Sequence, residues 1–259
     1  MKTPILLASL GDLRRNTAAK RRGTQIEVGR LSEGYYELLS VAPKRTRPFF
    51  SSTRTGIPPV DPFGRRKEER LAMAWFGAGR IDADGHFFRI LDYQFPLKSA
   101  KADAGIGKID LLAQSEEDQT LAIIELKVAT NKEDRRIAVL ESLIYSAIIE
   151  ANATTIAQQL MDAKGVVANG SRPKILIAAP SGYWRSGTPA LAEIEKLSED
   201  LRSSIPIEIS LLQYQIDENQ DYGLSGQFRS ARSSENEPNR SAIRLSRAKL
   251  DTISLPENT

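Results

Sequence analysis

The sequence predicts an α/β fold in which helices flank a mixed central sheet. Two observations support this class. From residue 65 onward, segments with helical periodicity alternate with apolar runs typical of buried strands, in the order helix, three strands, two helices, strand, helix, strand. The composition, 41% hydrophobic and 27% charged over 259 residues, is also that of a globular chain with enough apolar residues for a sizeable core.

Residues 1–62 lack a sustained period, and we expect them to form a basic N-terminal extension with short strands and a loop. Residues 25–28 and 35–39 have the composition of short strands. Residues 43–62 are rich in proline, serine, threonine and glycine, which predicts a long loop.

Basic residues concentrate in the N-terminal part of the chain. Residues 1–70 contain 15 Lys and Arg against 7 Asp and Glu, a balance of +8, whereas residues 71–259 contain 21 against 26, a balance of −5. Such a surface suits a phosphate polyanion, and Lys44, Arg45 and Arg47 are the candidate nucleic-acid contacts. A solvated basic arm without a partner explains the same charge distribution.

The main domain is expected over residues 63–222. It begins with a helix at 65–76, which ends at Gly77 and Gly79. Three strands follow, at residues 87–97, 107–113 and 121–128. A polar segment at 116–119 separates the last two strands and predicts that they pair as an antiparallel hairpin.

The second half of the domain begins with the strongest predicted helix, at residues 133–150. Its apolar residues recur at helical spacing at positions 137, 140, 144 and 148. Helices are then expected at 154–167 and 188–202, and strands at 174–180 and 205–214. From residue 223 the chain is polar and poor in apolar residues, which predicts a flexible tail over 223–259.

Three charged residues, Asp110, Glu125 and Lys127, interrupt the apolar arms of the predicted hairpin. The two-residue period of a strand puts Glu125 and Lys127 on one face, and pairing of the two arms brings Asp110 near Glu125. Buried charges are costly unless they are paired or bind a metal. A salt-bridged edge strand is the alternative interpretation, but the apolar neighbours argue against an edge.

The two carboxylates predict a Mg²⁺ or Mn²⁺ site formed by Asp110 and Glu125, because a divalent cation removes the repulsion between them. The chain has no cysteine, and its single histidine, His86, has no second histidine with which to share a site. Hard oxygen ligands favour Mg²⁺ or Mn²⁺ over zinc. Such a cation would bind a scissile phosphate and activate water, while Lys127 would orient or help to deprotonate that water.

The pattern Asp110-x14-Glu125-x-Lys127, on a hairpin flanked by helices, resembles the active-site motif of the PD-(D/E)XK nuclease superfamily. The resemblance covers roughly residues 65–180. An acidic residue in the helix before the hairpin, either Glu68 or Glu69, also fits the family.

The helix after the hairpin carries Glu141 and Tyr145 in the arrangement Glu-x-x-x-Tyr. This is similar to the Gln-x-x-x-Tyr element of the exonuclease branch, with glutamate in place of glutamine. No proline precedes Asp110, which is a second departure from the family pattern.

The resemblance implies a restriction-endonuclease-like core and metal-dependent hydrolysis of phosphodiester bonds, with DNA as the expected substrate. The implied catalytic residues are Glu68, Glu69, Asp110, Glu125, Lys127 and Tyr145. Two alternatives remain: a nucleic-acid-binding module that does not cleave, and an interaction domain in which these charges form a structural ion-pair network. No apolar run approaches eighteen residues and no cysteine is present, so we expect no membrane association and a cytoplasmic location.

Overall fold

The computed structural model describes residues 4–18, 27–53, 67–97, 107–186, 189–214 and 243–247, and it has the expected α/β class. Within these residues the strands, in spatial order, are β1 (Arg80–Ala83), β2 (His86–Pro96), β3 (Lys108–Ser115), β4 (Thr120–Leu126), β5 (Asn169–Pro180), β6 (Ile209–Tyr214) and β7 (Ile243–Arg247). The first four strands pair antiparallel, whereas β4, β5 and β6 run parallel. β7 pairs with both β6 and β1, so the sheet closes on itself.

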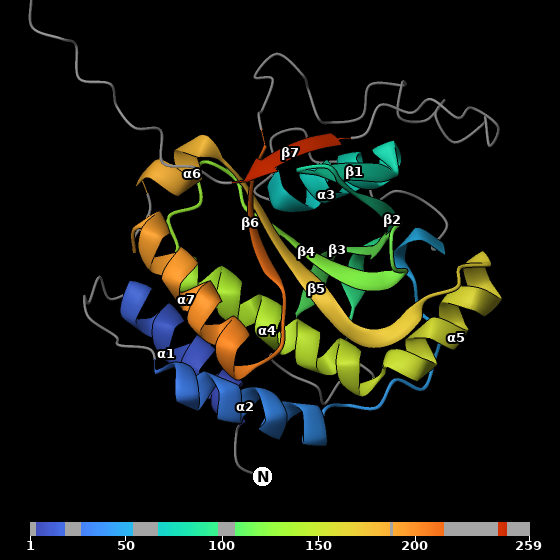
Figure 1. Ribbon diagram of the computed structural model, residues 1–259, viewed down its shortest axis with the longest axis horizontal. Coiled ribbons are helices and arrows are strands. Elements are labelled where there is room, and N and C mark those ends of the chain that lie inside the picture. Colours follow the sequence, from blue (N-terminus) through green and yellow to red (C-terminus); the bar gives the residue numbers. More distant parts are fainter. Residues whose placement is uncertain are drawn as a thin grey trace, which may run out of the picture.

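Helices pack against the sheet on both sides. They are α1 (Ile5–Ala18), α2 (Val28–Val41), α3 (Lys67–Ala78), α4 (Arg135–Ala151), α5 (Ala153–Lys164), α6 (Ser181–Ser186) and α7 (Leu191–Ser204), with a 3₁₀ turn, η1 (Ser51–Thr53). Figure 1 shows α4 crossing one face of the sheet, with α1 and α2 on its outer side, while α3 packs against β2, β3 and β4.

Two hydrophobic clusters follow from the alternation of side chains along the strands. On the α4 face, Ile123 of β4 packs in one cluster with residues of α1, α2, α4 and α7. On the α3 face, Ile124 packs with Leu71 and Trp75 of α3. Because both faces are covered, β4 is buried along its whole length, as expected for a central strand.

The structure confirms the elements predicted over the main domain. The helix expected at 65–76 is α3, the three strands are β2, β3 and β4, and the later helices and strands are α4, α5, β5, α7 and β6. The antiparallel hairpin of β3 and β4 is also confirmed. The short strand β1, which pairs with β2, was not predicted.

The strand expected at 35–39 is wrong, because this segment belongs to α2. Leu31, Tyr35 and Leu38 recur at helical spacing and are buried against the rest of the domain. The strand expected at 25–28 is also not found in its described part, since Val28 begins α2. Most of the described N-terminal residues are therefore helical and share the core of the sheet, where an extension was expected.

The expected flexible tail contains a strand, β7, at Ile243–Arg247. Its pairing with β1 and β6 supplies hydrogen-bond partners to both edges of the sheet, which polar composition alone does not predict. The rest of the segment 223–259 lies outside the described residues, as do residues 54–62 of the loop expected at 43–62; residues 43–50 of that loop form no helix or strand, and residues 51–53 form η1.

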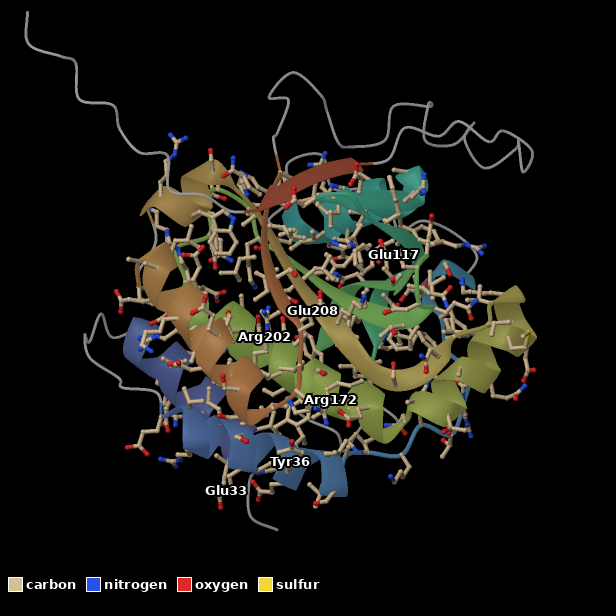
Figure 2. The ribbon with its side chains drawn as sticks, viewed as in Figure 1. Glu33, Tyr36, Glu117, Arg172, Arg202 and Glu208 are labelled. Carbon is tan, nitrogen blue, oxygen red and sulfur yellow. The ribbon has the colours of Figure 1, made fainter. Side chains whose placement is uncertain are left out.

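A buried polar network joins α2 to α4 and β5. The hydroxyl of Tyr35 lies 2.9 Å from Ser146 Oγ and donates to Glu150 Oε2 at 2.7 Å. Arg172, at the start of β5, donates to both oxygens of Glu150 at 2.6 and 2.9 Å, and Figure 2 shows it reaching towards these helices. These contacts hold α2 against α4, so the N-terminal helices are fixed relative to the sheet.

In the part of the chain that the structure describes, no single helix has the length and apolar composition of a membrane span; α4 and α5 pass that test only as a pair bent by 78°.

Gly34 of α2 packs against the start of α1. A Cβ added there would lie 3.0 Å from Ile5 Cβ and 3.1 Å from the backbone nitrogen of Leu6. We expect Gly34→Val to lower the free energy of unfolding by about 2 kcal/mol, because the two helices must separate. Gly29→Val, in the same helix but with no atom near an added Cβ, is the control and should change it by less than about 0.5 kcal/mol. Urea denaturation measures both; equal effects would contradict the packing of α1 on α2.

Candidate active site

Three polar side chains form a row across the centre of the sheet. The register of β2 with β3 sets Gln94 opposite Asp110, and the register of β3 with β4 sets Asp110 opposite Glu125. Residues directly opposite each other in antiparallel strands have neighbouring side chains on the same face. The predicted proximity of Asp110 and Glu125 is therefore confirmed, and Gln94 joins them.

Both oxygens of Asp110 accept hydrogen bonds from the surrounding sheet. Gln94 Nε2 donates to Oδ1 at 2.8 Å, and the backbone N–H of Leu126 donates to Oδ2 at 2.9 Å. Burial raises the pKa of Asp110 to about 6, although the charge of Lys127 and the hydrogen bond from Leu126 oppose the rise. Asp110 is thus a carboxylate in a site that disfavours its negative charge.

Lys127 lies between two buried carboxylates. Its Nζ donates to Glu125 Oε1 at 2.8 Å and to Glu141 Oε2 at 3.2 Å, and each of the three side chains is less than 10% exposed. Arg14 of α1 donates to the other oxygen of Glu141. Tyr214 donates to the carbonyl of Lys127 at 2.7 Å, which fixes the backbone at the end of β4.

The charges of this cluster shift the pKa values of its members. Burial raises the pKa of Glu125 well above its usual value, with Asp110 and Glu141 adding to the rise and Lys127 opposing it. Burial alone would lower the pKa of Lys127, but the carboxylates of Glu125, Glu141 and Glu68 outweigh it and raise that pKa. Lys127 is therefore protonated at neutral pH and is suited to stabilising negative charge rather than to accepting a proton.

Glu68, in the first turn of α3, approaches the cluster from the other side. Its Oε1 accepts a hydrogen bond of 3.0 Å from Asn131 Nδ2, and its charge contributes to the raised pKa of Asp110. Glu68 and Glu69 both line an open depression of about 540 Å³ in front of Asp110, whose other lining residues are Lys67, Gln94, Val128, Thr130 and Asn131. Both acidic candidates thus lie beside the site, and the charge of Glu68 acts on its buried groups.

Tyr145 lies against the start of β3. Its hydroxyl is so close to Gly107 that an added Cβ would overlap it, so residue 107 has no room for a side chain. Burial raises the pKa of Tyr145, and the charges of Glu125, Glu141 and Asp110 add to the effect. Tyr145 and Glu141, one turn apart on α4, therefore both face the cluster rather than solvent.

Acidic side chains outnumber basic ones in the cluster. It contains four carboxylates, on Glu68, Asp110, Glu125 and Glu141, against the two cations Arg14 and Lys127. Within the described ranges, no three acidic or histidine side chains gather closely enough to hold a metal ion by themselves. Two carboxylates are nevertheless a sufficient protein contribution for Mg²⁺, which usually keeps waters or substrate phosphate as its other ligands.

No family model, no curated protein and no solved structure matches this chain. The resemblance to the PD-(D/E)XK nucleases therefore depends on the residues described above and on their arrangement.

The segment expected to contact nucleic acid has two kinds of basic residue. Arg45 is engaged inside the protein: its guanidinium donates to Gln159 Oε1 at 2.7 Å and to the carbonyls of Pro96 and Phe49 at 2.9 and 2.6 Å. Because Nε, Nη1 and Nη2 all donate within the protein, the role of Arg45 is to stabilise the fold rather than to contact a phosphate. Lys44 and Arg47 are exposed, and the expectation stands for these two alone.

The residues predicted for the site do not include Gln94, Arg14 and Asn131, which also contact it. Gln94 had a detectable signal, since it is a polar residue between Tyr93 and Phe95 in an otherwise apolar strand. Arg14 and Asn131 had none, because their contacts with Glu141 and Glu68 join segments 127 and 63 residues apart.

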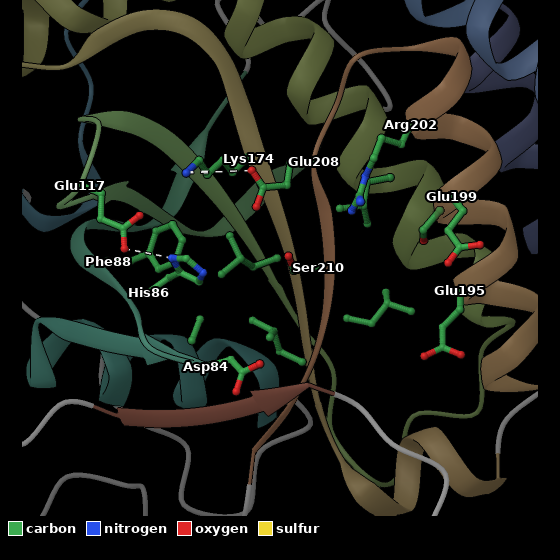
Figure 3. A pocket seen from close by; sticks show the side chains of 16 residues that line it. Asp84, His86, Phe88, Glu117, Lys174, Glu195, Glu199, Arg202, Glu208 and Ser210 are labelled. Atoms are coloured by element: carbon green, nitrogen blue, oxygen red, sulfur yellow. Dashed lines mark hydrogen bonds and ion pairs between the residues drawn. The ribbon is translucent and has the colours of Figure 1, made fainter.

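A second depression, of about 440 Å³, lies at the opposite end of the strands (Figure 3). Its floor includes Phe88 and Leu176, and His86 on its rim pairs with Glu117 at 2.9 Å. None of the predicted catalytic residues lines it. The predicted catalytic residues thus lie away from this depression, at the other end of the hairpin.

The raised pKa of Asp110 predicts a pH-dependent loss of stability. A carboxyl whose pKa rises to about 6 on folding destabilises the native state above that pH and has no such effect below about pH 4. We expect Asp110→Asn to raise the free energy of unfolding by about 1 kcal/mol at pH 8, and the gain to disappear at pH 4. Urea denaturation in EDTA at the two pH values measures the difference. An equal loss of stability of Asp110→Asn at both pH values would show that Asp110 is a structural hydrogen-bond acceptor only.

Proposed function

We propose that this protein is a nuclease that uses Mg²⁺ or Mn²⁺ to hydrolyse phosphodiester bonds, with DNA as its substrate and a restriction-endonuclease-like core as its scaffold. The observation that carries the proposal is the convergence of Asp110, Glu125 and Lys127 at the end of one hairpin, in a largely buried cluster where acidic side chains outnumber basic ones, next to an open depression. A purely structural cluster gains nothing from uncompensated negative charge.

Asp110 and Glu125 are the residues that would hold the cation. They fit it in chemistry, since both offer hard oxygen ligands, and in charge, since a divalent cation balances four carboxylates against two cations. The single histidine, His86, is occupied with Glu117 at the far end of the strands. When bound, the ion would polarise the scissile phosphate and lower the pKa of an attacking water.

The other residues have distinct roles in this proposal. Lys127, protonated and held between two carboxylates, provides positive charge next to the phosphate as negative charge develops on its oxygens. Glu141 positions Lys127 and is itself held by Arg14. Glu68 and Asn131 form the outer wall of the depression in which the substrate would lie.

Three lysines that line the depression or lie close in sequence to its lining residues support a polyanionic substrate. Lys67 begins α3, Lys108 begins β3 two residues before Asp110, and Lys132 follows Asn131 in the loop after β4. All three are exposed, and none forms an ion pair with another residue in the described ranges. Phosphates on either side of the scissile bond would find positive charge here, although the depression itself is acidic.

The interaction-domain alternative has one observation in its favour, the short ion pair between Lys127 and Glu125. In that case the cluster would bind no cation, and the substitutions below would change stability only.

The first test is cleavage of linear, circular and single-stranded DNA, with Mn²⁺ and with EDTA. We expect cleavage by the wild type only with Mn²⁺, and a loss of about 10²–10⁴-fold in rate for Lys127→Ala because the phosphate charge is no longer stabilised. Lys174→Ala, which removes another ion-paired lysine, is the control and should cleave normally. Absence of cleavage on every substrate would contradict the proposed activity.

The second test concerns the lysines around the depression. Replacing Lys67, Lys108 and Lys132 together by glutamine should weaken binding of a DNA duplex in Ca²⁺ and reduce the slope of log affinity against log salt by roughly 2–3. Replacing Arg30, Lys196 and Arg202, exposed cations of α2 and α7, makes the same change in net charge and should leave the slope nearly unchanged. Identical slopes for the two triple variants would show that the three lysines do not contact phosphates.

A further inference from the structure

Gln94 has a backbone conformation that side chains of its kind rarely adopt. Its φ is 45°, in the left-handed region, although it lies inside strand β2. The other non-glycine residues of the described chain with positive φ are Asp84 and Gln119, and both lie in turns between strands. A conformation that costs about 1 kcal/mol or more in a strand requires compensation from its surroundings.

The compensation comes from the 3₁₀ turn η1. Ser51 Oγ donates to the carbonyl of Gln94 at 2.9 Å. The carboxylate of Asp92, two residues earlier, accepts the backbone N–H groups of Ser51 and Ser52 at 2.9 and 2.8 Å. These three hydrogen bonds tie η1 to β2 around Gln94 and hold its backbone in place.

The side chain of Gln94 uses this conformation to reach Asp110. Its Nε2 donates to Oδ1 at 2.8 Å, while the N–H of Leu126 donates to Oδ2. A carboxylate with one donor on each oxygen has a fixed plane, and its remaining lone pairs have a fixed direction. Gln94 and Asp110 both line the depression, so these lone pairs lie at its inner wall.

An amide is suited to this task because it is neutral. Lysine or arginine at position 94 would also donate to Asp110, but either would neutralise part of the negative charge on which cation binding depends. Glycine would adopt the left-handed φ without strain, but it has no donor. The strained glutamine thus orients the carboxylate and leaves its charge intact.

We propose that Gln94 is a positioning residue that fixes Asp110 in the orientation needed to bind the divalent cation. This inference rests on the proposed role of Asp110 as a cation ligand. It assigns to η1, through Ser51, the function of supporting the site from the N-terminal part of the chain.

The test uses two substitutions at position 94 and one matched control. Gln94→Gly removes the donor and the strain, and Gln94→Met removes the donor while keeping a side chain of similar length. Gln119→Gly makes the same replacement at the other left-handed glutamine, φ 60°, in the turn at the far end of the hairpin. For each variant, calorimetry gives the affinity for Mn²⁺ alone, thermal unfolding in EDTA reports the fold, and DNA cleavage gives kcat and KM.

We expect both Gln94 variants to bind Mn²⁺ about ten-fold more weakly than the wild type, because partners of metal ligands contribute about this much to affinity. Their kcat should fall with KM for DNA nearly unchanged, since Gln94 acts on Asp110. Gln119→Gly should leave Mn²⁺ affinity and kcat as in the wild type. An unfolding midpoint of the Gln94 variants close to that of the wild type excludes a general loss of structure.

The outcomes separate this inference from the proposed function. Wild-type Mn²⁺ affinity in both Gln94 variants would overturn the positioning role, whether or not the protein cleaves DNA. The wild type could bind Mn²⁺ without cleaving DNA while the Gln94 variants bind Mn²⁺ more weakly. This result would support the positioning role and contradict the nuclease activity. A wild type that binds no Mn²⁺ would overturn both.

Discussion

The candidate site depends on how acidic side chains, which outnumber the basic ones, are held together at the end of one hairpin. Four carboxylates meet two cations there, and burial raises the pKa of both Asp110 and Glu125. Protein interiors rarely keep such an imbalance without a function, because desolvated like charges are costly. The proposed divalent cation would supply the missing positive charge, and the depression lined by Asp110 lies beside the cluster.

The surrounding elements hold this cluster in place. Helix α4 crosses the sheet and carries Glu141 and Tyr145 to it, and α1 adds Arg14 from the outer layer. The contacts of Tyr35 and Arg172 with Glu150 hold α2 and β5 on the same helix. The N-terminal region, expected to supply basic charge, also supplies packing and Arg14. Its support of the site is structural, from α1 through Arg14 and from η1 through Ser51.

The sequence was most informative where local pattern and burial agree. The hairpin of β3 and β4 and the proximity of Asp110 to Glu125 follow from strand periodicity and a polar turn, which are local signals. Helix α2 was mistaken for a strand because its pair of tyrosines has high strand propensity, while its burial depends on contacts with α4. Strand β7 and the role of Arg14 depend on long-range pairing, and the role of Gln94 depends on one unusual φ. A short window of sequence encodes neither.

The most direct test of this account is a Mn²⁺ titration of the purified protein by calorimetry, with the wild type and Glu125→Gln compared at pH 7.5. Glu125→Gln removes one negative charge and keeps the shape of the side chain, so a change in binding reports the charge itself. The account predicts one Mn²⁺ per wild-type chain and a large loss of affinity in the variant. No binding to the wild type, or equal binding to both, would contradict it and leave the cluster as an internal ion-pair network.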